Sequence, residues 1–174
     1  IVYIIIGFIY LRKLLKCFFN EKVTTVVIIA VLLGTNYLNI SISQTMMSHG
    51  PLFSLYCVAL FLTFKWHENP TYKRTIAFGL LIGLMIIVRP VELLFLLIPI
   101  FWKVNSFQSF WDKYVQLISK EWRKLLLFSI CIIAVGFIQL IYWKHVTGDW
   151  LFYSYDNPGE GFEFLAPYTI DFLF

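Results

Sequence analysis

The sequence predicts an all-α membrane protein, a multi-pass bundle of about six transmembrane segments. Its composition is the first observation: 60% of the 174 residues are hydrophobic, 20% are aromatic and 14% are charged. A soluble domain of this length cannot bury so much apolar surface. The second is that the apolar residues form runs separated by polar stretches. The third is that the basic residues collect in alternate loops between these runs.

Six apolar runs are the predicted membrane segments. They cover residues 1–11, 23–40, 50–65, 75–88, 91–103 and 125–143. A helix needs about 20 apolar residues to cross a hydrocarbon core of about 30 Å. The runs 75–88 and 91–103 are shorter, about 20 Å each. We therefore expect their junction, at Arg89 and Pro90, to lie near the lipid headgroups on the outer side.

The basic residues determine the predicted orientation. If the first, third and fifth loops are cytoplasmic, twelve of the fourteen basic residues lie inside; these are Arg12, Lys13, Lys16, Lys22, Lys65, Lys73, Arg74, Lys103, Lys113, Lys120, Arg123 and Lys124. This agrees with the positive-inside rule and places residues 41–50 and 144–174 outside the cytoplasm. An alternative, in which 75–104 is one long helix kinked at Pro90, puts the basic stretch 103–124 outside. The rule disfavours it.

The remaining stretches complete the predicted single domain, residues 1–174. Between 105 and 124, apolar and aromatic residues recur at helical spacing; they are Phe107, Phe110, Trp111, Tyr114, Ile118 and Trp122. This pattern predicts an amphipathic helix on the cytoplasmic leaflet. Residues 144–174, with the turn-forming "DNPGEG", are expected to form an external loop. Because the chain begins inside an apolar run, we expect an internal fragment of a longer protein. The three cysteines show no metal spacing.

Arg89 is the first candidate site residue. A cation at the predicted depth is costly unless it reaches the headgroups, forms an ion pair or faces a polar cavity. In one interpretation Arg89 extends to the headgroups and Glu92, one helical turn on, neutralises it. In the other, Arg89 holds an anion such as a lipid phosphate, because its planar fork donates paired hydrogen bonds.

Two further stretches carry candidate residues. His49, in "SISQTMMSHGPLF" (41–53), is suited to bind a phosphate, a metal or a sugar hydroxyl. The alternative is an ordinary loop histidine, because no second ligand stands at metal spacing, and a divalent metal is left open without a ligand set. Residues 144–174 mix aromatic and acidic side chains, including Tyr153 and Glu160. This composition suits a sugar site or an interfacial aromatic belt.

Three quoted stretches resemble a known family when they are taken in order. They are "MMSHGPLFSLYCVALFLTF", "GLLIGLMIIVRPVELLFLLIPI" and "YWKHVTGDWLFYSYDNPGEGFEFLAP". They resemble the multi-pass GT-C glycosyltransferases, in particular bacterial members of the dolichyl-phosphate-mannose-protein mannosyltransferase group. The resemblance implies transfer of a sugar from a polyprenyl-phosphate carrier to a glycan, lipid or protein acceptor outside the cytoplasm. It implies Arg89 as the donor-phosphate ligand, with His49, Glu92, Tyr153 and Glu160 as substrate-binding candidates. The family's catalytic aspartate falls in a part that this sequence does not cover, so the catalytic residues are unknown.

Two other function classes stay open. A flippase or polymerase of polyprenyl-linked glycans would place charges midway along its helices, facing a central pathway. A non-catalytic membrane protein would need no phosphate site. All three classes have the lipid bilayer as partner. Nucleic acid is not expected, since no basic cluster lies on a soluble face.

Overall fold

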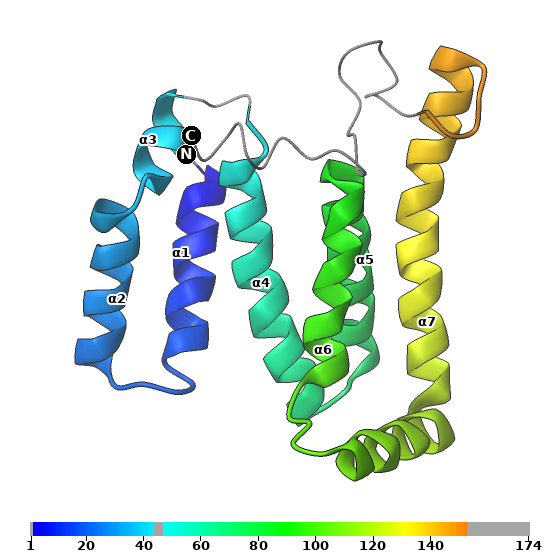
Figure 1. Ribbon diagram of the computed structural model, residues 1–174, viewed down its shortest axis with the longest axis horizontal. Helices are drawn as coiled ribbons and strands as arrows, with labels where there is room; N and C mark the ends of the chain where they lie inside the picture. The colour runs from blue at the N-terminus through cyan, green and yellow to red at the C-terminus, as the bar shows by residue number, and fades with distance from the viewer. Residues whose placement is uncertain (1, 44–46, 153–174) are drawn as a thin grey trace, which may run out of the picture. The chain divides into compact units, whose positions relative to one another are not determined.

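The computed structural model describes residues 2–43 and 47–152, and all of its regular elements are helices (Figure 1). They are α1 (Val2–Leu15), α2 (Glu21–Gly34), α3 (Tyr37–Ser43), α4 (His49–Glu68), α5 (Tyr72–Val88), the 3-10 helix η1 (Pro90–Leu96), α6 (Leu97–Phe101) and α7 (Phe107–Thr147). The chain divides into two compact units, residues 1–137 and 138–174. The fold and the sites described below belong to the first unit.

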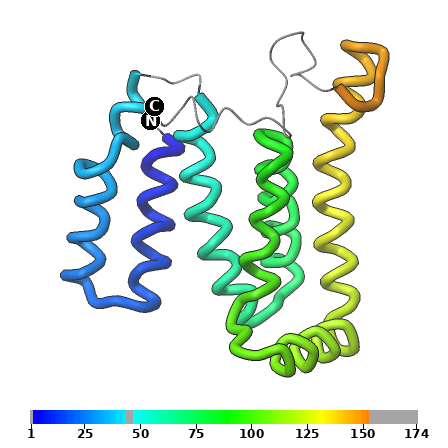
Figure 2. The backbone as a smooth tube through the Cα atoms, viewed as in Figure 1, coloured from blue at the N-terminus to red at the C-terminus, as the bar shows by residue number. Residues whose placement is uncertain are grey.

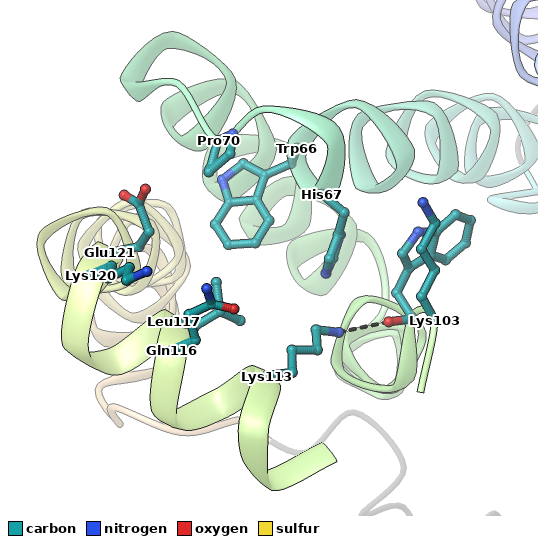
Figure 3. A pocket seen from close by; sticks show the side chains of 10 residues that line it. Trp66, His67, Pro70, Lys103, Lys113, Gln116, Leu117, Lys120 and Glu121 are labelled. Carbon is teal, nitrogen blue, oxygen red and sulfur yellow. Dashed lines mark hydrogen bonds between the residues drawn. The ribbon is translucent and has the colours of Figure 1, made fainter. Parts of the chain in front are cut away.

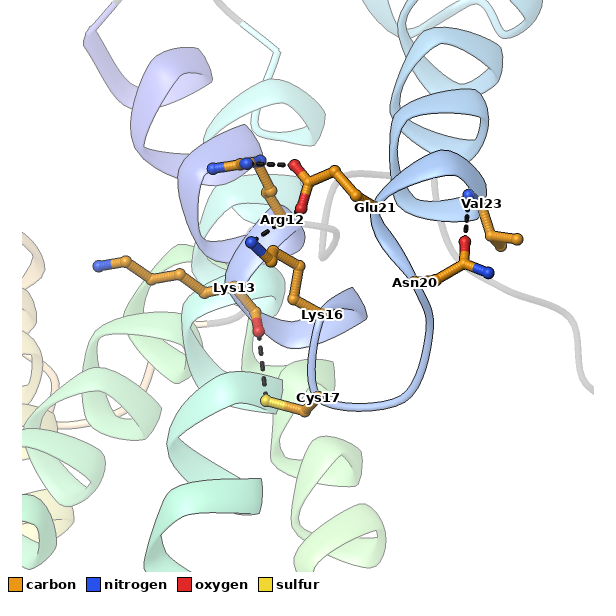
Figure 4. Close-up of polar contacts among 7 residues, drawn as sticks. All are labelled: Arg12, Lys13, Lys16, Cys17, Asn20, Glu21 and Val23. Atoms are coloured by element: carbon orange, nitrogen blue, oxygen red, sulfur yellow. Dashed lines mark hydrogen bonds and ion pairs between the residues drawn. The ribbon is translucent and has the colours of Figure 1, made fainter.

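Polar contacts hold the turn between α1 and α2 (Figure 4). The Asn20 side chain accepts a hydrogen bond from the backbone N–H of Val23 at 3.0 Å and so caps the start of α2. Glu21 follows it and forms ion pairs with Arg12 and, at 2.8 Å, with Lys16. Hydrogen bonds from Lys16 and Arg12 hold the pKa of Glu21 below its ordinary value. The polar sequence between the first two apolar runs therefore specifies a tight turn.

The core of this unit lies between α4, α5 and η1. Its buried hydrophobic residues are Ala59, Trp66, Phe78, Ile82, Met85 and Phe95. On the other side of α4, α1 packs closely because small residues meet there. The Oγ of Ser54 donates a 2.7 Å hydrogen bond to the carbonyl of Tyr3, and a Cβ added to Gly7 would lie 2.6 Å from that Oγ.

Helix α7 approaches α5 through two glycines one helical turn apart. A Cβ on Gly79 would lie 2.7 Å from the Cβ of Cys131 and 2.8 Å from the carbonyl oxygen of Phe128. A Cβ on Gly83 would lie 2.7 Å from the Cβ of Val135. Such small-residue pairs let two helix backbones come unusually close.

The chain reverses direction at Arg89, as Figure 2 traces from α5 into η1. Arg89 has an extended backbone (φ −151°, ψ 120°), and Pro90 begins η1, which packs back against α5. The helical region is disfavoured for a residue that precedes proline, and proline fits a helix start because it has no N–H to satisfy. The predicted break is confirmed, and the alternative of one long helix over 75–104 is excluded.

Helix α7 contains a kink that separates two different sequences. Glu121 has non-helical angles (φ −122°, ψ 16°). The preceding residues, 107–120, are the helical part of the stretch predicted as an amphipathic helix. Several of its apolar residues are exposed, with Phe107 at 78% and Ile118 at 60%, whereas Phe110, Tyr114 and Leu117 are half-buried. Its placement on the cytoplasmic leaflet stays a prediction.

The predicted bundle of about six membrane segments is wrong. Among the described helices only α7 is long and apolar enough to cross a membrane, and α2 with α3, bent by 51°, would qualify only as a pair. The reason is length: α1 and α2 have 14 residues each and α5 has 17. At about 1.5 Å per residue these helices fall short of a core of about 30 Å.

The other predicted segments also fail to qualify. Helix α4 has 20 residues, but His49 and Pro51 lie at its start and Lys65, His67 and Glu68 at its end. The predicted segment 91–103 is divided between η1 and the 5-residue helix α6. The regular elements of residues 2–43 and 47–152 are therefore all helical, and one of these helices is long and apolar enough to cross a membrane, so a multi-pass arrangement is not supported.

Candidate functional site

The backbone holds Arg89 in a defined position at the end of α5. Its N–H donates to the carbonyl of Met85 at 3.0 Å, and its own carbonyl accepts from the N–H of Glu92 at 2.9 Å. The side chain is half-buried. Because the backbone polar groups are satisfied locally, the guanidinium is the only group of Arg89 left to interact with other molecules.

Glu92 does not form an ion pair with Arg89. Glu92 is 7% exposed, and its carboxylate accepts a hydrogen bond from the hydroxyl of Tyr56 in α4. The Tyr56 ring packs against Phe95, with ring centroids 5.4 Å apart. No ion pair joins Arg89 to Glu92, since the four salt bridges of the described residues involve other side chains. Glu92 thus fastens η1 to α4.

Arg89 therefore has no ion-pair partner among the described residues. A guanidinium carries several N–H donors and no acceptor, so it requires carbonyl, carboxylate or phosphate oxygens. Among the described residues, none is found within hydrogen-bond distance of the Arg89 side chain. A half-buried arginine of this kind can hold an anion in a bidentate contact.

His49 is the first residue of α4 and is exposed. Because α4 and α5 run antiparallel, the start of α4 and the end of α5 lie at the same end of the pair (Figure 1). The next residue, Gly50, is buried, and its carbonyl accepts a 3.4 Å hydrogen bond from the hydroxyl of Tyr37. No group of three or more His, Cys, Asp or Glu side chains that could hold a metal occurs in the described part of the chain. His49 therefore has no ligand set there.

The other candidates and one missed residue complete this site. Tyr153 and Glu160 lie outside the described residues. Tyr56 was not predicted, although a tyrosine hydroxyl inside an apolar run needs an acceptor when it is buried. Its acceptor, Glu92, is 36 residues away, and no local pattern shows that pairing.

A second feature lies at the opposite end of α5, about 25 Å from Arg89 along a 17-residue helix. It is a cavity of about 370 Å³, which we call the basic cavity (Figure 3). Its lining includes Trp66, His67, Trp102, Lys103, Lys113 and Lys120. From the sequence these cations were assigned only to cytoplasmic loops. The sequence feature that could have indicated this cavity is the adjacency of aromatic and basic residues in "KWH" (65–67) and "FWK" (101–103).

Comparison with known protein families, curated proteins and solved structures finds no match in any of the three.

Proposed function

We propose that this protein is a membrane glycosyltransferase that moves a sugar from a polyprenyl-phosphate carrier to a glycan, lipid or protein acceptor. One observation carries the proposal: Arg89 is a half-buried cation at a helix end, and it forms no ion pair with Glu92 or with any other described residue. The sugar-transfer chemistry in this proposal comes from the resemblance of the three quoted stretches to GT-C glycosyltransferases, although no family model matches the chain. The bilayer would hold the prenyl chain and bring its phosphate to the protein.

The proposed role of Arg89 follows from the charge that develops during transfer. The bond between the sugar C1 and the phosphate oxygen breaks, and the acceptor oxygen forms the new bond to C1. Negative charge grows on the departing phosphate, and donors aimed at it lower the barrier. The acceptor hydroxyl loses its proton to a general base, to which no described residue is assigned. In this proposal His49, Glu92, Tyr153 and Glu160 stay the substrate-binding candidates, and a divalent metal stays open.

We propose the cytoplasmic membrane as the location. Large apolar side chains are exposed on several helices, for example Leu33 at 70% and Ile133 at 67%, and an apolar environment would cover them. Basic residues precede the apolar part of α7, which orients its start toward the cytoplasm. Residues 144–174, which follow the apolar part of α7, would then lie outside the cytoplasm. The predicted external position of residues 41–50 required several crossings and is not proposed.

Cysteine labelling tests this orientation. Cys17 is exposed, whereas the other two cysteines are buried. The variant Cys17→Ser therefore has no exposed native cysteine among the three. In that background Gly148→Cys should react with an impermeant maleimide added to intact cells, and Asn69→Cys should react only after the cells are opened. The reverse pattern would refute the orientation.

Phosphate recognition is tested by binding polyprenyl phosphate to the full chain in nanodiscs. Arg89→Gln should weaken binding at least tenfold, and Arg89→Lys should restore part of it as a point charge. Arg123→Gln, the same change at an exposed residue, is the matched control and should bind normally. Unchanged binding by Arg89→Gln would end the proposal.

A transfer assay with the polyprenyl-linked sugar separates the function classes. Turnover that falls with Arg89→Gln supports the transferase. Binding without transfer, accompanied by movement of the lipid between leaflets, would indicate a flippase instead. A protein that neither binds nor transfers would belong to the non-catalytic class.

A further inference from the structure

The basic cavity is built where the ends of three helices meet. The end of α4 contributes Trp66 and His67, the residues after α6 contribute Lys103, and α7 before its kink contributes Lys113 and Lys120. Figure 3 shows the two rings on one side of the cavity and the α7 side chains on the other. The wall on the α4 side is rigid, because the buried indole N–H of Trp66 donates a 2.9 Å hydrogen bond to Thr75.

Not all of its charges are available to a ligand. The Lys113 ammonium donates to the carbonyl oxygens at the end of α6, at 2.8 Å to Trp102 and 3.2 Å to Ile100. The acid in the lining, Glu121, is paired with Lys124 at 2.6 Å. A lysine at a helix end stabilises the helix dipole, so Lys113 is a structural cation.

Lys103 and Lys120 have no such role. Both are exposed at the rim, and the salt bridges of the described residues include neither of them. The indole N–H of Trp102, another lining residue, is buried without a hydrogen-bond partner among the described residues. The cavity therefore offers two ammonium groups, while the acid in its lining is already paired. Its charge suits an anion.

An apolar cavity adjoins the basic one. It has a volume of about 170 Å³ and shares Trp66, His67 and Leu117 with the basic cavity. The rest of its lining is almost entirely hydrophobic and includes Phe78, Leu96, Pro99, Ile100, Leu125 and Phe128. A polar cavity next to an apolar one, with three lining residues in common, suits an amphiphile with an anionic head and a hydrocarbon chain.

We propose that the basic cavity binds the phosphate of an anionic lipid, whose chain enters the adjoining apolar cavity. This site is separate from the donor site proposed at Arg89, because it lies at the other end of α5. It does not depend on the glycosyltransferase proposal. The phosphate group is shared by lipids and by free phosphate, and the chain cavity is what favours the lipid.

The backbone of Lys103 provides the most informative variant. Lys103 has a positive φ of 58°, which is costly for a residue with a side chain and favourable for glycine. Lys103→Gly therefore removes the ammonium group while relieving backbone strain. A loss of binding in this variant cannot be attributed to a loss of folding if its melting temperature is unchanged or raised.

The experiment uses the full chain in detergent and native mass spectrometry to count bound lipid. The probes are dioleoyl-phosphatidylglycerol, dioleoyl-phosphatidylcholine with the same chains, and inorganic phosphate. Phosphatidylglycerol should bind at least fivefold tighter than phosphatidylcholine. Lys103→Gly and Lys120→Gln should each remove most of that preference, whereas Lys22→Gln, at an exposed lysine of α2, should keep it.

The remaining outcomes decide between a lipid and free phosphate. If inorganic phosphate displaces phosphatidylglycerol fully at equal concentration, the proposal of a lipid ligand is wrong, because the hydrocarbon chain would then contribute nothing to binding. Leu117→Phe places a larger side chain at a residue that lines both cavities. It should weaken the binding of phosphatidylglycerol more than the binding of phosphate. Equal binding of both lipids by the wild-type protein, or an unchanged preference in both lysine variants, would refute the site. These outcomes are independent of whether Arg89→Gln weakens the binding of polyprenyl phosphate.

Discussion

Replacing Gly79 with alanine tests the close contact between α5 and α7. The added Cβ would lie 2.7 Å from the Cβ of Cys131 and 2.8 Å from the carbonyl oxygen of Phe128. Both neighbours are fixed by the α7 backbone, so neither can rotate away. The helices must shift apart or deform.

The expected free energy change combines two opposing effects. Alanine stabilises a helix by about 1 kcal/mol relative to glycine, and overpacking a close contact costs about 1–3 kcal/mol. Gly136 in α7 is the matched control, because a Cβ there would meet nothing within 4 Å. The propensity gain cancels between the two alanine variants. Gly79→Ala should therefore be less stable than Gly136→Ala by about 1–3 kcal/mol.

This difference is measured by a denaturant titration in mild detergent, with circular dichroism as the probe of unfolding. The comparison is made between the two variants as well as with the wild-type protein, so that detergent effects are shared. Equal midpoints for Gly79→Ala and Gly136→Ala would refute the close approach of the two helices.

Three other changes are expected to have measurable effects on stability. Tyr56→Phe leaves the buried carboxylate of Glu92 without its donor and should cost about 1–3 kcal/mol in the same assay, with part recovered by adding Glu92→Gln. Asn20→Ala removes the cap of α2 and should cost about 1 kcal/mol, and no change would show that the cap is not needed. Burial lowers the pKa of His67, with Lys113 adding to the effect, so the unfolded state takes up a proton first as the pH falls. Stability should be full above about pH 6.5 and decrease below it, and His67→Gln should flatten this dependence.

The sequence predicted where most helices begin and end. Pro90 favours the break after α5, because proline disfavours the helical region for the residue before it, and the structure has that break at Arg89. The helical spacing of aromatic residues after 105 predicted the first part of α7. These predictions succeeded because they depend on neighbours along the chain.

The prediction of six membrane segments failed because hydropathy shows that a run is apolar but not that it forms one unbroken helix. The run 23–40 is divided at Thr35, where the chain is extended and bends by 51° into α3. The hydroxyl of Thr35 accepts from the N–H of Tyr37 at 3.2 Å and supports this bend. Local hydrogen bonds of this kind interrupt a helix without making the sequence less apolar.

The amino-acid sequence by itself determined that the described residues are helical and where several of their turns lie, because backbone preferences and capping act between residues a few positions apart. Only the tertiary structure decided which polar groups meet. Glu92 is hydrogen-bonded to Tyr56, 36 residues away, rather than to Arg89, and the basic cavity collects residues from α4, α7 and the turn between α6 and α7. The physical reason is that a buried polar group bonds to the partner that packing brings within reach, and packing joins segments that are distant in sequence.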